Sequence, residues 1–156
     1  MADSSAQSPP IPLASPVRLL DVMSLAQYDK RGNTPAPSPA ELNPIAGMKY
    51  AGKDQWEAAE KKLLVSRDEA LTTADCEPEP LAIAYSALGY VYAHTRDFDR
   101  AIENYLQSLQ VWERVYKNPT DPRLAEFLRD IALIFQLKGD DAKRAEFESK
   151  AAAVKK

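Results

Sequence analysis

Apolar residues recur at helical spacing in two consecutive stretches, 81–94 and 98–116. One face of the first predicted helix carries Tyr85, Leu88, Val91 and Tyr92. The stripe on the second comprises Phe98, Ala101, Ile102, Tyr105, Leu109, Trp112 and Tyr116. Polar Thr95-Arg96-Asp97 separates them, and Asp97 is suited to cap the second helix by accepting a backbone hydrogen bond. The pattern predicts two antiparallel helices that bury their stripes against each other, at about 1.5–3 kcal/mol for each large side chain.

The same pattern returns more weakly on both sides of this pair. Downstream, a predicted helix starting near Pro122 and ended by Gly139 is followed by a last helix that begins at Asp140 or Asp141. Upstream, residues 44–51 form a degenerate first helix, with Ile45 and Ala46 aligned to Leu88 and Gly89. Asp54 is then expected to cap a helix over 55–73, whose apolar side is Trp56, Ala59, Leu63, Ala70 and Leu71. About three stacked repeats are the minimum for a stable core.

The central stretch resembles the tetratricopeptide repeat, through Leu88-Gly89-x-x-Tyr92 in the first helix and Ala101 and Tyr105 in the second. The long second helix and the link after it look like the extended variant of roughly 42 residues found in kinesin light chains. In the last repeat Ala145 sits one place late and Glu148 replaces an aromatic residue, as suits a solvent-facing terminal helix. The resemblance implies an all-α, short right-handed α-solenoid of about three such helical hairpins.

The chain is predicted to divide into a proline-rich N-terminal arm, 1–43, and a helical repeat domain, 44–156. Eight of the twelve prolines lie in the first 44 residues, which favours an extended conformation. Within the arm, a short amphipathic helix is expected over about 16–30, and its apolar side carries Leu19, Leu20, Val22 and Met23. Three interpretations stay open: this helix caps its own repeat domain, it docks on a partner protein, or it stays disordered.

Composition gives no sign of chemistry or of other classes of partner. The net charge of −3 shows no basic excess, so no nucleic acid is expected, and no apolar run reaches the length of a membrane span. The N-terminus lacks a signal-peptide pattern, so the cytoplasm is the default location. Cys76 is the lone cysteine and His94 the lone histidine, so no metal-site spacing exists and no cofactor is expected. We therefore predict that the protein is not an enzyme.

The resemblance implies that the first helices line a concave face that holds ligands. By aligned position, this implicates Ser86, Tyr90 and His94 in the central repeat, Tyr50 in the degenerate repeat, and Arg129, Leu133 and Gln136 in the terminal repeat. In the arm, Leu19, Leu20, Val22 and Met23 would make a second contact. Tyrosine and arginine are frequent interface anchors. The alternative is that Tyr50 and Tyr90 only pack between repeats.

We therefore predict a non-catalytic protein–protein interaction scaffold, such as an adaptor, an assembly factor or an accessory subunit of a larger complex. A protein partner would place a peptide or a helix in the concave groove. The alternative within binding proteins is a self-associating structural protein, which would be a homo-oligomer. A small enzyme is the least favoured class.

Overall fold

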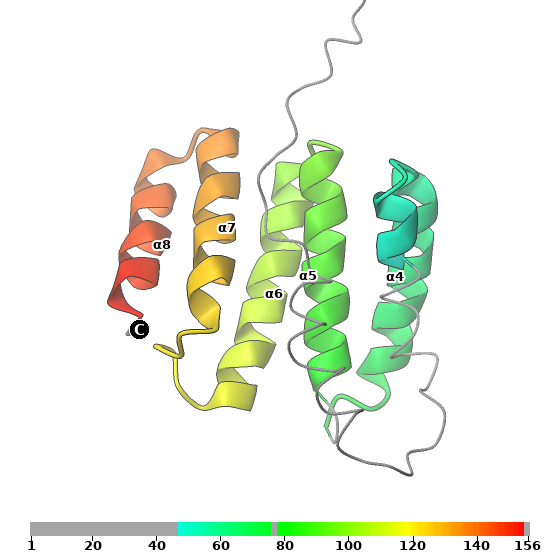
Figure 1. The fold of residues 1–156 in the computed structure, drawn as a ribbon, viewed down its shortest axis with the longest axis horizontal. Helices are drawn as coiled ribbons and strands as arrows, with labels where there is room; N and C mark the ends of the chain where they lie inside the picture. The colour runs from blue at the N-terminus through cyan, green and yellow to red at the C-terminus, as the bar shows by residue number, and fades with distance from the viewer. Residues whose placement is uncertain (1–46, 76–77, 155–156) are drawn as a thin grey trace, which may run out of the picture.

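The computed structural model describes residues 47–75 and 78–154, and all regular structure in these ranges is helical. Residues 47–51 are helical and are followed by α4 (Trp56–Leu71), α5 (Glu79–His94), α6 (Phe98–Tyr116), α7 (Leu124–Lys138) and α8 (Asp141–Ala153). Consecutive helices lie side by side and run in opposite directions (Figure 1). The predicted all-α stack of helical hairpins is confirmed. The predicted extended proline-rich arm, residues 1–43, and its amphipathic helix lie outside the described residues.

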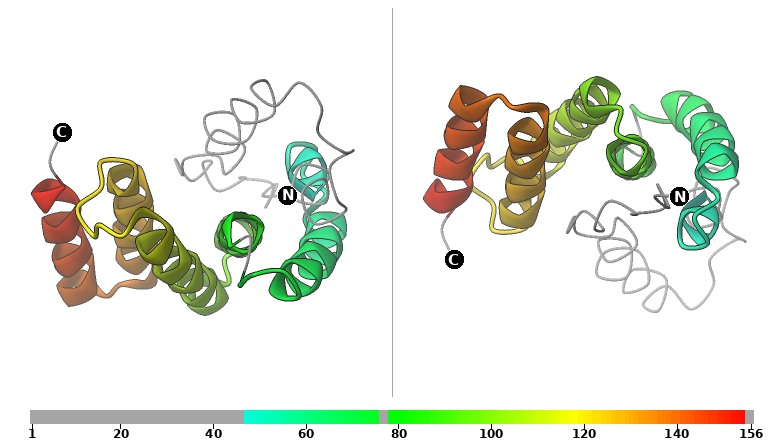
Figure 2. Two further views of the ribbon diagram at one scale, coloured as in Figure 1. Left: turned by 90° about the horizontal axis from the view of Figure 1, so that it is seen from below. Right: turned by 90° about the horizontal axis from the view of Figure 1, so that it is seen from above.

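The helices form two layers (Figure 2). The first helix of each hairpin, namely residues 47–51, α5 and α7, lies on the inner side of an arc, and the second helices, α4, α6 and α8, lie on the outer side. No helix in the described part of the chain is both long and apolar enough to cross a membrane.

Three equivalent turns join the inner helices to the outer ones. The backbone N–H groups of Gln55, Asp97 and Asp140 donate to the carbonyls of Tyr50, Tyr92 and Phe135, at 2.9, 2.8 and 2.9 Å respectively. The residue before each of these donors has a left-handed backbone: φ is 57° at Asp54, 65° at Arg96 and 92° at Gly139. The shared geometry defines the register between hairpins, which is 42 residues for the first step and 43 for the second.

This register corrects two sequence predictions. Gly47, not Ala46, stands at the position of Gly89. Asp54 does not cap α4, because it is the left-handed residue of its turn; the N-cap is Gln55, which makes no side-chain capping bond. The predicted caps at the other two turns are confirmed, since Asp97 accepts from Arg100 N at 3.2 Å and Asp140 accepts from Lys143 N at 3.0 Å.

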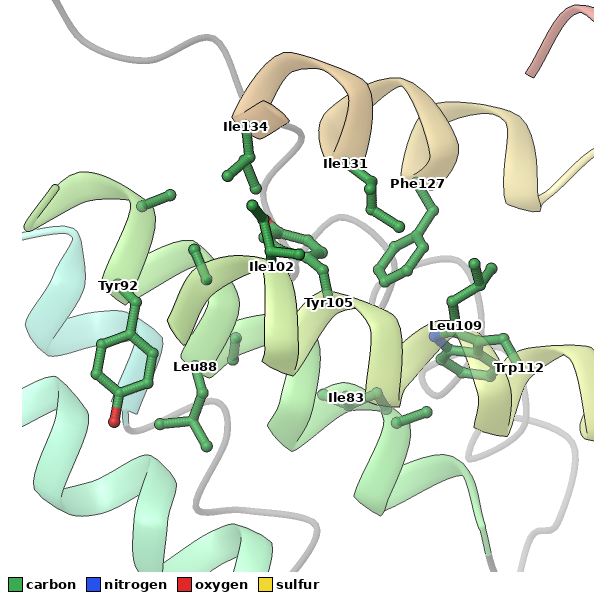
Figure 3. Packing of buried hydrophobic residues seen from close by; sticks show 14 of the residues in the cluster. Ile83, Leu88, Tyr92, Ile102, Tyr105, Leu109, Trp112, Phe127, Ile131 and Ile134 are labelled. Carbon is green, nitrogen blue, oxygen red and sulfur yellow. The ribbon is translucent and has the colours of Figure 1, made fainter. Parts of the chain in front are cut away.

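The close approach of α5 to α6 is centred on Gly89 and Tyr105. A Cβ atom at Gly89 would lie only 2.5 Å from Cδ2 of the Tyr105 ring. Tyr105 is 1% exposed, and its ring also packs on Phe127 of α7 with centroids 5.3 Å apart (Figure 3). The same arrangement occurs one hairpin earlier, where a Cβ at Gly47 would lie 2.7 Å from Leu63. Glycine therefore lets a large side chain of the outer helix fill the space beside the inner helix.

Polar contacts tie the first two hairpins together. The Tyr92 hydroxyl on α5 donates to Glu60 Oε1 on α4 at 2.9 Å. The Arg100 guanidinium of α6 lies over the Tyr92 ring, 5.5 Å from its centroid. Between α5 and α6, the Ser108 hydroxyl donates to the Ala82 carbonyl at 2.6 Å. These bonds fix how the helices sit relative to each other, because each has a defined donor and acceptor.

The link between the second and third hairpins is built around Arg123. Its side chain donates twice to the Asp121 carboxylate, at 2.8 Å each, and lies 3.7 Å from the centroid of the Tyr116 ring. The hydrogen bonds from Arg123 lower the pKa of Asp121 to about 2. α7 begins at Leu124, two residues later than the proline start expected from the sequence. Asp121 therefore holds the turn rather than capping the helix.

The last helix, α8, has an apolar side and a charged side. Phe147 is buried and stacks on Phe135 of α7, with centroids 5.5 Å apart. Ala145 and Glu148 are exposed, as expected for a terminal helix. The charged side carries ion pairs along the helix: Lys143–Glu146, Lys150–Glu146, Arg144–Asp141 and Arg144–Glu148.

We predict that Gly89→Ala lowers the free energy of unfolding by about 1–3 kcal/mol, because the new Cβ overlaps the enclosed Tyr105 ring. The matched control is Gly52→Ala, whose Cβ would meet only carbonyl oxygens, at 3.5 and 3.6 Å. The control should stay within about 0.5 kcal/mol of the wild type. Urea denaturation followed by circular dichroism measures both; equal losses would contradict the packing argument.

Candidate functional site

Three aromatic rings from two hairpins meet at the inner layer, and we call them the ring cluster: Trp56 of α4, and Tyr90 and His94 of α5. The Trp56 and His94 rings are stacked, with centroids 4.9 Å apart and an interplanar angle of 8°. Tyr90 is tilted against both, at 4.4 Å from His94 and 6.4 Å from Trp56. All three side chains are half-buried. The cluster thus closes the seam between the first two hairpins and still reaches the surface.

The surroundings of His94 favour its neutral form. Burial lowers the pKa of its imidazole below 6.5; the charge of Arg96 lowers it further, while that of Asp54 raises it. Its Nε2 atom is shielded from solvent and has no hydrogen-bond partner among the described residues. A neutral imidazole has one donor and one acceptor nitrogen. His94 can therefore still accept or donate one hydrogen bond inside the ring cluster.

Burial and neighbouring carboxylates together affect the ionisation of two tyrosines in this region. Burial raises the pKa of Tyr90, and the negative charges of Asp130 and Asp54 raise it further. Asp130 lies on α7 and is 8% exposed, while Asp54 is exposed in the first turn. The Tyr105 hydroxyl is enclosed, has no hydrogen-bond partner among the described residues, and its pKa is raised well above 10 by burial and then by Asp130. Both phenols are therefore kept protonated, by burial first and by the neighbouring carboxylates second.

The structure brings together two of the residues predicted for the central repeat. Tyr90 and His94 are both in the ring cluster. Ser86 instead is 2% exposed, and its hydroxyl donates to the Ile83 carbonyl of its own helix at 2.9 Å. Its burial does not favour a direct contact with a ligand. Tyr50 is 36% exposed and occupies the turn position of Tyr92 rather than that of Tyr90.

In the terminal repeat, the predicted residues lie on α7. Arg129 and Gln136 are exposed and Leu133 is half-buried. The turn register aligns His94 with Leu137, which is 38% exposed, and not with Gln136. The predicted arm contacts, Leu19, Leu20, Val22 and Met23, lie outside the described residues. A binding role for any of these residues stays a prediction.

Sequence reasoning did not assign Trp56, Asp130 or Leu137 to the site. Trp56 was assigned to the apolar stripe of its helix, yet its ring reaches the inner layer from the start of α4. Leu137 would follow from an alignment made on the capping turns, since Asp140 stands 43 residues after Asp97. Asp130 gives no sequence signal, because an acidic residue within a predicted helix is usually solvated.

An open depression lies between the α5–α6 turn and the end of α7. It has a volume of about 420 Å³ and is lined by the turn residues 95–99 together with Leu137 and Lys138. Lys138 forms an ion pair with Asp99 across it. No group of three or more His, Cys, Asp or Glu side chains within 47–75 and 78–154 could hold a metal ion.

Stacked antiparallel hairpins with their first helices on one side define a helical-repeat domain. Residues 80–155 match the family model of the tetratricopeptide repeat. No curated protein matches the sequence. The chain is thus a tetratricopeptide-repeat-containing protein, and such repeats are generally protein-interaction modules.

We predict that proton NMR of the single imidazole gives a pKa below 6.5, because burial disfavours the charged ring. A histidine whose pKa is lower in the folded state than in the unfolded state stabilises the fold fully above the unfolded pKa of 6.5. This stabilisation is lost as the pH falls toward the folded pKa. The wild type should therefore lose more stability than His94→Gln between about pH 7 and pH 5. A normal pKa of 6.5 and parallel stability curves would contradict the enclosed, neutral histidine.

Proposed function

We propose that this protein is a non-catalytic interaction scaffold that binds a peptide or a helix of a partner protein on its inner face. It would serve as an adaptor, an assembly factor or an accessory subunit of a larger complex. One observation carries the proposal: Trp56, Tyr90 and His94 converge from two hairpins and remain half-buried on the inner side. Partly exposed aromatic side chains of this kind are typical centres of binding energy in protein interfaces.

The rigidity of the stack supports this function. The Tyr92–Glu60 hydrogen bond and the stacked Trp56 and His94 rings hold α4 against α5. A surface that is already ordered loses little conformational entropy when a partner binds. The inner face is therefore suited to recognise a segment that is itself flexible.

The arm would add a second contact. We propose the division into arm, 1–43, and repeat domain, 44–156, on the strength of the prolines in the first segment. Two contacts on one chain raise the apparent affinity through effective concentration.

The extended repeat seen in kinesin light chains fits the steps of 42 and 43 residues between turns.

Self-association through the C-terminal end is the weaker proposal. The exposed side of α8 carries ion pairs and no large apolar side chain. Charged rows of this kind cost desolvation when they are buried against a second copy. We therefore prefer a different protein as the partner.

We predict that Tyr90→Ala reduces by about tenfold the amount of partner captured from native extract at low salt, because it removes the ring at the centre of the cluster. The matched control is Val65→Ser, which removes a half-exposed apolar side chain on α4 away from the ring cluster. Quantitative mass spectrometry of the captured proteins measures both variants. No partner with the full chain, or equal capture by Tyr90→Ala, would refute the proposal.

A second prediction concerns the arm. Deleting residues 1–40 should weaken capture of the partner and leave the helical circular dichroism of the repeat domain nearly unchanged. The denaturation curve of the deleted chain serves as the control. A loss of cooperativity instead would identify the arm as a cap on its own repeat domain.

A further inference from the structure

We propose that the depression at the α5–α6 turn binds an apolar side chain of the partner segment together with the carboxylate of an acidic residue beside it. The apolar side chain would lie on Phe98 and Leu137, and the carboxylate would pair with the guanidinium of Arg96. This inference rests on the proposed function, and it adds a second contact of defined chemistry for the partner segment.

The repeat register relates this depression to the ring cluster. The steps of 42 and 43 residues align Trp56 with Phe98 and His94 with Leu137. Trp56 and His94 stack on each other across the seam between the first two hairpins. Phe98 and Leu137 both line the depression, which lies between the second and third hairpins. The same two positions are therefore closed by stacked rings at the first seam and line an open surface at the second.

The depression is open enough for a polypeptide segment to reach it. Its sides are the α5–α6 turn and the end of α7, which lie at the same edge of the stack (Figure 1). Its volume of about 420 Å³ falls within the range of about 300–1,000 Å³ that is typical of ligand-binding clefts. Leu137 is 38% exposed and Phe98 is half-buried. They give the depression an apolar part, from which a bound apolar side chain would displace water.

The pairing of charges leaves the guanidinium of Arg96 available. Two acids line the depression: Asp97 forms an ion pair with Arg100 at 3.4 Å, and Asp99 forms one with Lys138. Arg96 also lines the depression, is exposed, and makes no ion pair among the described residues. A guanidinium binds a carboxylate well, because it presents two parallel N–H donors. Since both acids are already paired with cations, the remaining charge favours an acidic residue of the partner.

The geometry also sets the spacing in the partner. Arg96 and Phe98 are two positions apart in the same turn, and both line the depression. The two side chains that they bind must therefore be close neighbours as well. A large apolar residue with an acidic residue adjacent or nearly adjacent in the sequence satisfies this condition.

The test is a selection of random dodecapeptides on the immobilised full chain at low salt. We expect this combination of an apolar and an acidic residue to be enriched by about threefold or more over the starting library. Synthetic versions of the selected peptides are then measured by fluorescence anisotropy. They should bind about threefold to tenfold more weakly when the acid is replaced by its amide, because the amide keeps the shape and loses the charge.

Two variants locate the two contacts. Arg96→Gly removes the guanidinium and suits the left-handed backbone at this position, where φ is 65°. It should weaken binding of the acidic peptide by about threefold to tenfold and leave binding of the amide version unchanged. Leu137→Ala should weaken binding of both versions by about threefold to tenfold, because it removes part of the apolar surface.

Each variant has a matched control elsewhere in the repeat domain. Lys117→Gly removes an exposed cation from a left-handed position, with φ of 53°, at the opposite end of α6. Leu71→Ala shortens a leucine that is 50% exposed at the end of α4. Both controls should leave the affinity unchanged. Equal weakening by Arg96→Gly and Lys117→Gly would reveal a general effect of charge and overturn the proposal.

The outcomes separate this inference from the function on which it rests. Selected peptides that lose affinity for Tyr90→Ala but bind Arg96→Gly normally would overturn the proposed contact and leave the scaffold intact. A selection that enriches nothing would also overturn the proposed contact. Capture of a partner from native extract would then decide the scaffold function on its own.

Two other occupants of the depression would also be recognised. In the arm, Asp21 stands between Leu20 and Val22, which is the same combination of residues. If Asp21→Asn in the full chain raises the affinity for the selected peptide, the arm is the occupant. If light scattering finds a dimer for the full chain and a monomer for Arg96→Gly, the occupant is a second copy. Either result would overturn the proposal of a separate partner.

Discussion

The contact between Gly89 and Tyr105 is the constraint on which the rest of the stack depends. Without a Cβ at position 89, the Tyr105 ring enters the space between α5 and α6 and extends to Phe127 of α7. One side chain therefore sets both the distance within the central hairpin and its contact with the next one. The first hairpin uses the same solution with Gly47 and Leu63. The third has Ala132 at the glycine position and buries Phe147 against Phe135.

This packing also shapes the inner face. Because Tyr105 fills the seam, its hydroxyl is enclosed and has no hydrogen-bond partner among the described residues. The turns also contribute, because each one fixes where an inner helix ends and an outer helix begins. The chain that follows the first turn places Trp56 against the end of α5, where Tyr90 and His94 lie. The contacts that hold the hairpins together therefore also position the residues of the candidate site.

Much of the fold follows from the sequence because its signals are local. The helical stripes, the caps Asp97 and Asp140 and the left-handed Gly139 each depend on residues within one or two turns of chain. The register of the first hairpin does not, because a one-residue difference in the links between repeats leaves the stripes intact. The step from the first hairpin to the second is 42 residues, and the next step is 43 residues. Gly47 consequently occupies the position that the sequence alignment assigned to Ala46. A capping rule also fails at Asp54, because it does not predict a non-glycine residue with a left-handed backbone.

The candidate site was less predictable because a stripe does not show which of its members reach the surface. Tyr90 and His94 were identified from their aligned positions, yet Ser86, chosen by the same alignment, is buried. Trp56 was assigned to the apolar side of its helix, although its side chain is only partly buried and stacks on His94. These differences depend on neighbouring helices, and a single-helix pattern contains no information about them.

The charged side of α8 has a consequence for how the molecule behaves when it is concentrated. Helical repeats can in principle add to one another end to end and grow into filaments, since each unit exposes the surface that the next one covers. Here the exposed side of α8 carries ion pairs, including Arg144–Glu148 and Lys150–Glu146. A further hairpin or a second copy that packed on this side of α8 would have to bury these charges, and the cost of their desolvation opposes such a contact.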